Sequence, residues 1–227
     1  MLRFCSSLLL LPLCAAVFLA AADALRAASG AGDLCSPPAL AFGAGFFAWV
    51  AAALCFKAPA RAYVLGHELT HALWGLLFGA RVGRMRVSAR GGSVMLSKTN
   101  MWISLAPYFF PFYTVVVAGV YAVASCFADM GGGWRLVFLF LVAHTWGFHL
   151  TFTLGALRAR QPDVVENGRV FSWVVIWLAN VLGAGVWIAA MTPAGLPLFW
   201  ESLCGRTLSA YAWVWGVLQT AWSHVAH

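Results

Sequence analysis

The chain has 227 residues, of which 63% are apolar and only 9% are charged. Twelve Trp and seventeen Phe lie outside the usual composition of a soluble domain and are typical of a bundle of membrane helices. The net charge is +7, but the basic residues fall mostly between apolar stretches, which indicates membrane orientation rather than nucleic-acid binding. We therefore expect an integral membrane protein that contacts the lipid bilayer and has no nucleic-acid partner.

The first apolar segments predict helices of membrane-spanning length. Residues 1–22 are either a cleaved signal peptide or a first spanning helix, and length does not separate these two alternatives. An apolar run over 39–56 is long enough to cross a bilayer. A further helix is expected over 60–79, because Pro59 fits its first turn and Gly79 suits its C-terminal cap.

Residues 81–99 have a different character. Apolar residues alternate there with basic ones around Gly91-Gly92, and the basic residues are Arg81, Arg84, Arg86, Arg90 and Lys98. This alternation predicts a small β-hairpin at the membrane surface, facing the lipid headgroups.

Three more spans are predicted at 101–125, 134–157 and 169–190. A Trp-rich amphipathic stretch over 207–225 crosses the membrane or lies in its interface. The predicted fold is an all-α membrane protein, a bundle of about six to seven transmembrane helices with a small membrane-associated β-hairpin. It forms one integral-membrane domain over 1–227.

The distribution of basic residues predicts which side of the membrane each loop occupies. If every predicted span crosses, nine basic residues fall on the side of the hairpin and five on the other. Loops rich in Lys and Arg face the cytoplasm. The hairpin and the 158–169 loop are therefore expected in the cytoplasm, and the protein is expected to be a multi-pass component of the cytoplasmic membrane.

The segment His67-Glu68-Leu69-Thr70-His71 indicates a metal site. Residues four apart lie on one face of a helix, so His67 and His71 can bind one ion with Glu68 beside them. Burying such a carboxylate among apolar residues is costly unless it serves a purpose. The pattern is a zinc hydrolase signature in which Glu68 is the general base of amide hydrolysis.

A catalytic zinc usually takes three protein ligands and leaves a fourth position for water, so one more ligand is needed. The candidates are Asp163, Glu166, His144 and His149. Asp163 follows Pro162 in a polar break between spans, where irregular backbone is tolerated, and we favour it. Its alternative role is an ordinary helix cap. His144 and His149 point about 140° apart on a helix and fit packing roles better.

These residues resemble the site-2 protease group of intramembrane zinc metalloproteases over roughly residues 60–175. The His67-Glu68-x-x-His71 helix followed by Gly79 is similar to the metal-binding helix of that family. Residues 82–96 with Gly91-Gly92 are similar to its membrane-associated sheet, and Ser104 to Tyr108 resemble the start of its next helix.

The segment of the third ligand departs from the family pattern. Pro162-Asp163 with Asn167-Gly168-Arg169 resembles the family segment in which an aspartate directly precedes glycine. Here Glu166 lies nearer that place, and Asp163 lies three residues earlier. Asp163 is retained because the residue type matches, and Glu166 is the named substitute.

The resemblance implies a protease core over 60–175 that cleaves membrane-embedded segments of protein or peptide substrates. It implies Zn²⁺ held by His67, His71 and Asp163, with Glu68 as the catalytic base. We further expect the edge of the hairpin to pair with an unwound substrate strand.

Two other functions remain open from the sequence. One is a catalytically inactive membrane protein with a structural metal site, against which an intact Glu68 argues, since a structural site needs no base. The other is a metal-handling transporter, which only the His-Glu-His cluster supports, because the spans show no inverted repeat.

Overall fold

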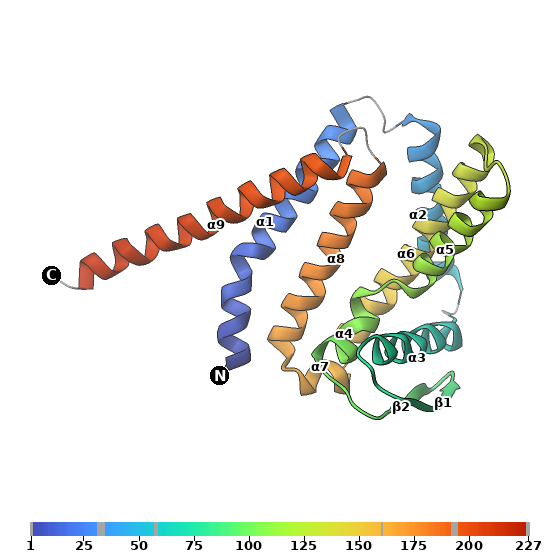
Figure 1. Ribbon diagram of the computed structural model, residues 1–227, viewed down its shortest axis with the longest axis horizontal. Helices are drawn as coiled ribbons and strands as arrows, with labels where there is room; N and C mark the ends of the chain where they lie inside the picture. Colours follow the sequence, from blue (N-terminus) through green and yellow to red (C-terminus); the bar gives the residue numbers. More distant parts are fainter. Residues whose placement is uncertain (1, 31–34, 57–58, 160, 192–194, 226–227) are drawn as a thin grey trace. The chain divides into compact units, whose positions relative to one another are not determined.

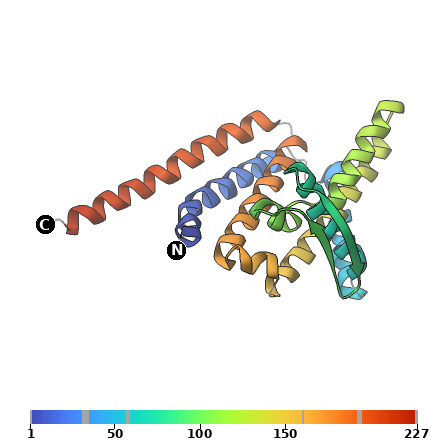
Figure 2. The ribbon, with the colours of Figure 1, turned by 60° about the horizontal axis from the view of Figure 1, so that its bottom comes forward.

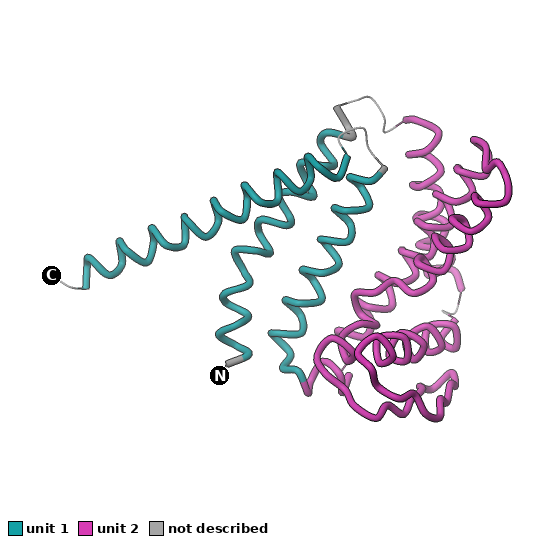
Figure 3. Tube along the Cα trace, in the orientation of Figure 1, with its two compact units in different colours: residues 1–34, 167–227 teal, residues 35–166 magenta. Residues whose placement is uncertain are grey.

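The computed structural model describes residues 2–30, 35–56, 59–159, 161–191 and 195–225. The chain forms two compact units, residues 1–34 with 167–227 and residues 35–166 (Figure 3). The predicted core over 60–175 does not coincide with either unit, because residues 167–175 belong to the first.

The first unit contains three helices (Figure 1), which are α1 (Leu2–Gly30), α8 (Arg169–Met191) and α9 (Gly195–Val225). Helix α1 packs against both of the others, as Figure 2 also shows. Their shared core consists of Val17, Ala20, Ala24, Ala189, Phe199 and Leu203. Asp23 of α1 forms an ion pair of 2.9 Å with Arg206 of α9 and accepts a hydrogen bond from Ser202. Residues 2–22 are thus helical, whereas their cleavage stays a prediction.

The second unit contains the remaining elements (Figure 1), which are α2 (Pro37–Cys55), α3 (Ala60–Leu77), β1 (Val82–Ser88), β2 (Gly91–Leu96), α4 (Met101–Phe109), α5 (Phe112–Phe127), α6 (Gly132–Arg158) and α7 (Pro162–Glu166). Helix α2 packs along α6, and α3 packs against α4 and both strands. Gly79 has a φ of 71°, the left-handed conformation that commonly ends a helix. The predicted helices over 39–56, 60–79, 134–157 and 169–190 are confirmed to within a few residues.

Four helices in the described part of the chain are long and apolar enough to cross a membrane: α1, α2, α6 and α8. The pair α4 and α5 counts as a fifth span if it is taken together. This composition is that of a multi-pass membrane protein, but the expected six to seven spans are not confirmed. Helix α3 is less apolar than a membrane span because it carries the polar site residues. Helix α9 is less apolar because Gln, Ser and aromatic residues interrupt its aliphatic ones.

The segment predicted as one span over 101–125 is broken. Helix α4 ends at Phe109, α5 begins at Phe112, and their axes differ by 74°. Pro111 causes the break, because proline lacks an amide donor and forces the residue before it away from the helical region. Phe110 accordingly has φ −98° and ψ 106°. The bend allows α4 to cover α3 while α5 packs along α6.

The predicted β-hairpin is confirmed. Strands β1 and β2 are antiparallel, with Ser88 paired to Gly91 across the turn and Met85 paired to Val94. Gly92 allows β2 to approach α3 closely, since a Cβ there would lie 2.6 Å from Cγ1 of Val64. The hairpin therefore lies directly over the helix that carries the His-Glu-His motif.

Candidate metal centre

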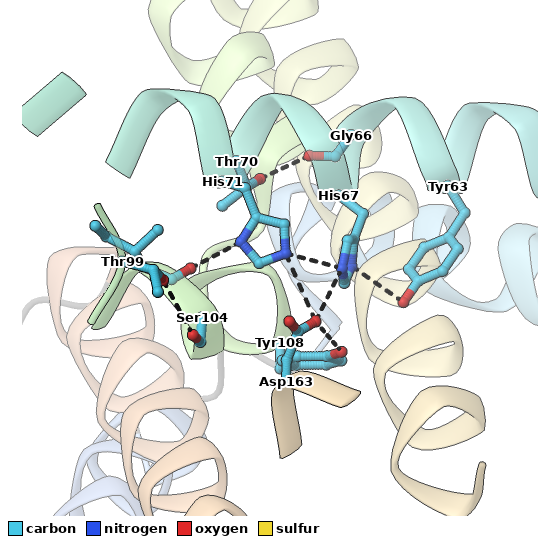
Figure 4. A network of polar contacts seen from close by, with 10 residues as sticks. Tyr63, Gly66, His67, Thr70, His71, Thr99, Ser104, Tyr108 and Asp163 are labelled. Atoms are coloured by element: carbon cyan, nitrogen blue, oxygen red, sulfur yellow. Dashed lines mark hydrogen bonds and ion pairs between the residues drawn. The ribbon is translucent and has the colours of Figure 1, made fainter. Parts of the chain in front are cut away.

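Two imidazoles of α3 face the same point in space (Figure 4). His67 and His71 are one helical turn apart, so their side chains share a face of the helix. Their Nε2 atoms lie 3.2 Å from each other. His71 is buried and His67 is half-buried, and both rings border a polar cavity. The two rings therefore share the helix face that their spacing predicts, whereas their role as metal ligands stays a prediction.

Asp163 completes a group of three possible ligands. It lies in the first turn of α7, and its Oδ2 is 3.5 Å from Nε2 of His67 and 3.6 Å from Nε2 of His71. These separations can be compared with those in a zinc site. Tetrahedral zinc with bonds of about 2.0–2.1 Å spaces its ligand atoms about 3.3–3.4 Å apart. The three residues therefore fit the ion in spacing and in donor type.

A hydrogen bond determines which ring nitrogen of His71 carries the proton. Nδ1 of His71 lies 2.9 Å from the main-chain oxygen of Ile103 in α4. A carbonyl oxygen only accepts hydrogen bonds, so Nδ1 donates to it and Nε2 presents its lone pair to the centre. Nδ1 of His67 lies 3.4 Å from the hydroxyl of Tyr63. These outer contacts orient both rings as metal ligands require.

Tyr108 is a residue of the site that sequence reasoning did not single out for its side chain. Its hydroxyl donates a hydrogen bond of 3.0 Å to Oδ2 of Asp163, and its ring meets His67 edge-on at 5.3 Å. The residue is fully buried. The only signal in the sequence was a hydroxyl directly after Pro107 in an apolar segment, which does not reveal its partner.

Glu68 lies beside the three possible ligands without joining them. Glu68 is 6% exposed, and it borders the same cavity as His67 and His71. Burial raises the pKa of Glu68, although the charges of the two histidines and a hydrogen bond from the Val94 backbone oppose that rise. Burial thus makes the protonated form of this carboxyl easier to reach than in an exposed glutamate, and a carboxyl group can accept and release a proton in catalysis.

The electrostatics of Asp163 differ from those of Glu68. Burial by itself would raise the pKa of Asp163, but its contacts with His67 and His71 outweigh burial and hold that pKa below its usual value. An ionised carboxylate is the form that binds a divalent cation. The two histidines therefore favour the ionised form of Asp163, which is the form that a metal site needs.

The cavity at this centre has a volume of about 550 Å³. It is lined from α3 by His67, Glu68 and His71, and from β2 by residues 91–94 and Leu96. Strand β1 pairs with one edge of β2 in this two-stranded sheet. The other edge of β2 does not pair with β1.

The other candidate ligands lie apart from this group. Glu166 is exposed at the end of α7. His144 packs between Phe140 and Trp49, and His149 borders a different, much smaller cavity. Among the described residues, His67, His71 and Asp163 are the His, Cys, Asp and Glu residues whose ligand atoms converge.

Two histidine nitrogens and one carboxylate oxygen form a donor set that zinc accepts in hydrolases. Comparison of the chain with protein families, curated proteins and solved structures finds no match. The chemistry of the site is therefore argued from its own residues.

Proposed function

We propose that the chain is a zinc-dependent intramembrane endopeptidase, which hydrolyses peptide bonds in membrane-embedded segments of its substrates. The observation that carries this proposal is the convergence of His67, His71 and Asp163, with separations of 3.2, 3.5 and 3.6 Å between their ligand atoms. Glu68 beside them is the expected base. The site-2 protease resemblance of the motifs supports the same function.

The roles of the residues follow from their positions. When bound, zinc polarises the scissile carbonyl and activates a water molecule. Glu68 takes a proton from that water and passes it to the nitrogen of the breaking amide bond, so that an acid and an amine leave. His71 stays oriented by Ile103 during this exchange.

The strand beside the cavity supports a peptide substrate. A substrate helix must unwind before one of its carbonyl groups can reach the metal, because its backbone hydrogen bonds are internal. The edge of β2 that borders the cavity can accept an extended strand by main-chain hydrogen bonding. The substrate is thus a membrane protein or peptide whose chain lies along β2.

Helices that are long and apolar enough to span a bilayer support an activity within a membrane. We propose the cytoplasmic membrane, with the hairpin on the cytoplasmic side, because its five basic residues favour that side.

Metal analysis of purified protein tests the proposed function. Wild-type protein is expected to hold one zinc ion, Asp163→Asn to lose it, and Glu166→Gln to keep it. Glu166 is the matched control because it lies on the same short helix but is exposed.

Three results would contradict the proposal or part of it. Wild-type protein that binds no zinc after reconstitution would exclude the hydrolase. If Glu166→Gln lost zinc and Asp163→Asn kept it, the third ligand would be Glu166 and not Asp163. Zinc uptake into vesicles that Glu68→Gln leaves unchanged would favour a transporter.

A further inference from the structure

Helix α4 makes hydrogen bonds to two of the three possible metal ligands. Its Ile103 carbonyl accepts from Nδ1 of His71 at 2.9 Å, and its Tyr108 hydroxyl donates to Oδ2 of Asp163 at 3.0 Å. These contacts come from residues five apart on one short helix, and Figure 4 shows Tyr108 beside Asp163. Helix α4 therefore joins the ligands of α3 to the ligand of α7.

Tyr108 contacts the particular carboxylate oxygen that faces the imidazoles. Oδ2 of Asp163 is the atom that lies 3.5 Å from His67 and 3.6 Å from His71. A carboxylate can rotate about its bond to Cβ, and α7 is only five residues long. A donor fixed on another helix limits that rotation and holds the same oxygen toward the centre.

The tyrosine is itself firmly placed. It is 0% exposed, its ring lies edge-on to His67, and its main-chain oxygen accepts a hydrogen bond of 3.4 Å from Thr153 in α6. A fully buried side chain packed in this way has few alternative rotamers. Its hydroxyl is thus a preorganised donor.

We propose that Tyr108 is a positioning residue that orients Asp163 for metal binding, so that its hydroxyl sets the zinc affinity of the site. This inference rests on the proposed function and names a residue that the motif does not contain. Tyr108 acts through Asp163 and has no contact with the peptide in this role.

The test is the zinc affinity of Tyr108→Phe in purified protein, measured by competition with a chelator at fixed pH. The variant keeps the buried ring and loses only the hydroxyl. Loss of an outer contact to a metal ligand typically weakens metal binding about 10–100-fold, and we expect a decrease in that range. The cobalt-substituted variant should also show visible absorption bands that differ from those of cobalt-substituted wild type.

Tyr113→Phe is the matched control. Tyr113 donates its hydroxyl to the main-chain oxygen of Ala62 in α3, so this variant also removes a hydroxyl that contacts α3. We expect its zinc affinity to equal that of wild type, and the thermal unfolding of both variants should remain cooperative.

The possible outcomes separate this inference from the proposed function. Wild-type zinc affinity in Tyr108→Phe would overturn the inference and leave the hydrolase intact. An equal loss in both variants would also overturn it, because the effect would then be general destabilisation. Wild-type protein without any zinc would overturn both.

Discussion

Glu68 lies next to His67 in the chain, and both side chains border the cavity. Its position one residue after the first ligand is set by the helix, because successive residues turn by about 100°. Its carboxyl group therefore lies near the metal ligands without being the third one. In the proposed mechanism this carboxyl would exchange a proton while His67, His71 and Asp163 hold the ion.

Replacing Glu68 by Gln should separate binding from catalysis. Glutamine has nearly the same shape but accepts no proton, so hydrolysis of a transmembrane peptide should fall by about 10²–10⁴-fold. Zinc content should stay at the wild-type value, because His67, His71 and Asp163 are unchanged. The measurement pairs a cleavage assay with metal analysis of the same sample, and hydrolysis at the wild-type rate would remove Glu68 from the mechanism.

The sequence was informative about the residues of α3 and less so about their partners. The spacing of His67 and His71 predicts a shared face because a single helix decides it. Residue type favours Asp163 over Glu166, and both lie in the polar break between two apolar spans. The structure brings Asp163 to the imidazoles. Tyr108 could not be predicted, since its contact with Asp163 joins residues 55 positions apart.

At the scale of the elements, the break at Phe110-Pro111 shows where hydropathy is a poor guide. An apolar run over 101–125 satisfies the composition of one span, but Pro111 removes the amide that would continue the helix. The resulting bend of 74° gives α4 its own direction. Only because α4 departs from the axis of α5 do its Ile103 and Tyr108 reach the site.

The packing of β2 on α3 depends on Gly92. A Cβ at this position would lie 2.6 Å from Cγ1 of Val64 and 2.8 Å from Cγ of Glu68. We expect Gly92→Ala to move the hairpin away from α3, to reduce stability by about 1–3 kcal/mol, and to lower peptide cleavage. Zinc content should stay unchanged, because no metal ligand comes from the hairpin.

Gly119→Ala in α5 is the control, since a Cβ there meets nothing within 4 Å. Thermal unfolding, cleavage and metal content of both variants make the comparison. Cleavage that is equally high in Gly92→Ala and in wild type would show that the position of β2 does not matter for the substrate.

At the scale of the whole molecule, the candidate spans give a topology that differs from the expected one. Suppose that five segments cross the membrane: α1, α2, the pair α4 and α5, α6, and α8. Eleven of the fourteen basic residues, including the five of the hairpin, then lie on the hairpin's side, and three lie on the other side. The split from six crossing helices was nine to five. The five-span topology therefore follows the positive-inside rule more strongly.

This topology predicts that the N-terminus, the hairpin and α7 all face the cytoplasm. Cysteine at Arg90 in a background without the native cysteines should react with a membrane-impermeant thiol reagent only from the cytoplasmic side. Cysteine at Asp129, in the turn between α5 and α6, should react only from the opposite side. Labelling of both positions from one side would contradict the five-span arrangement.

The size of the cavity has a consequence for how such a protease would choose its targets. One turn of an α-helix with its side chains fills roughly 400–600 Å³, which is nearly all of the 550 Å³ beside β2. A frayed stretch of a few residues would match this cavity better than an intact helix that crosses the bilayer. Selection would then follow the local melting tendency of the target, and a glycine or proline near the cut point would count for more than any particular side chain.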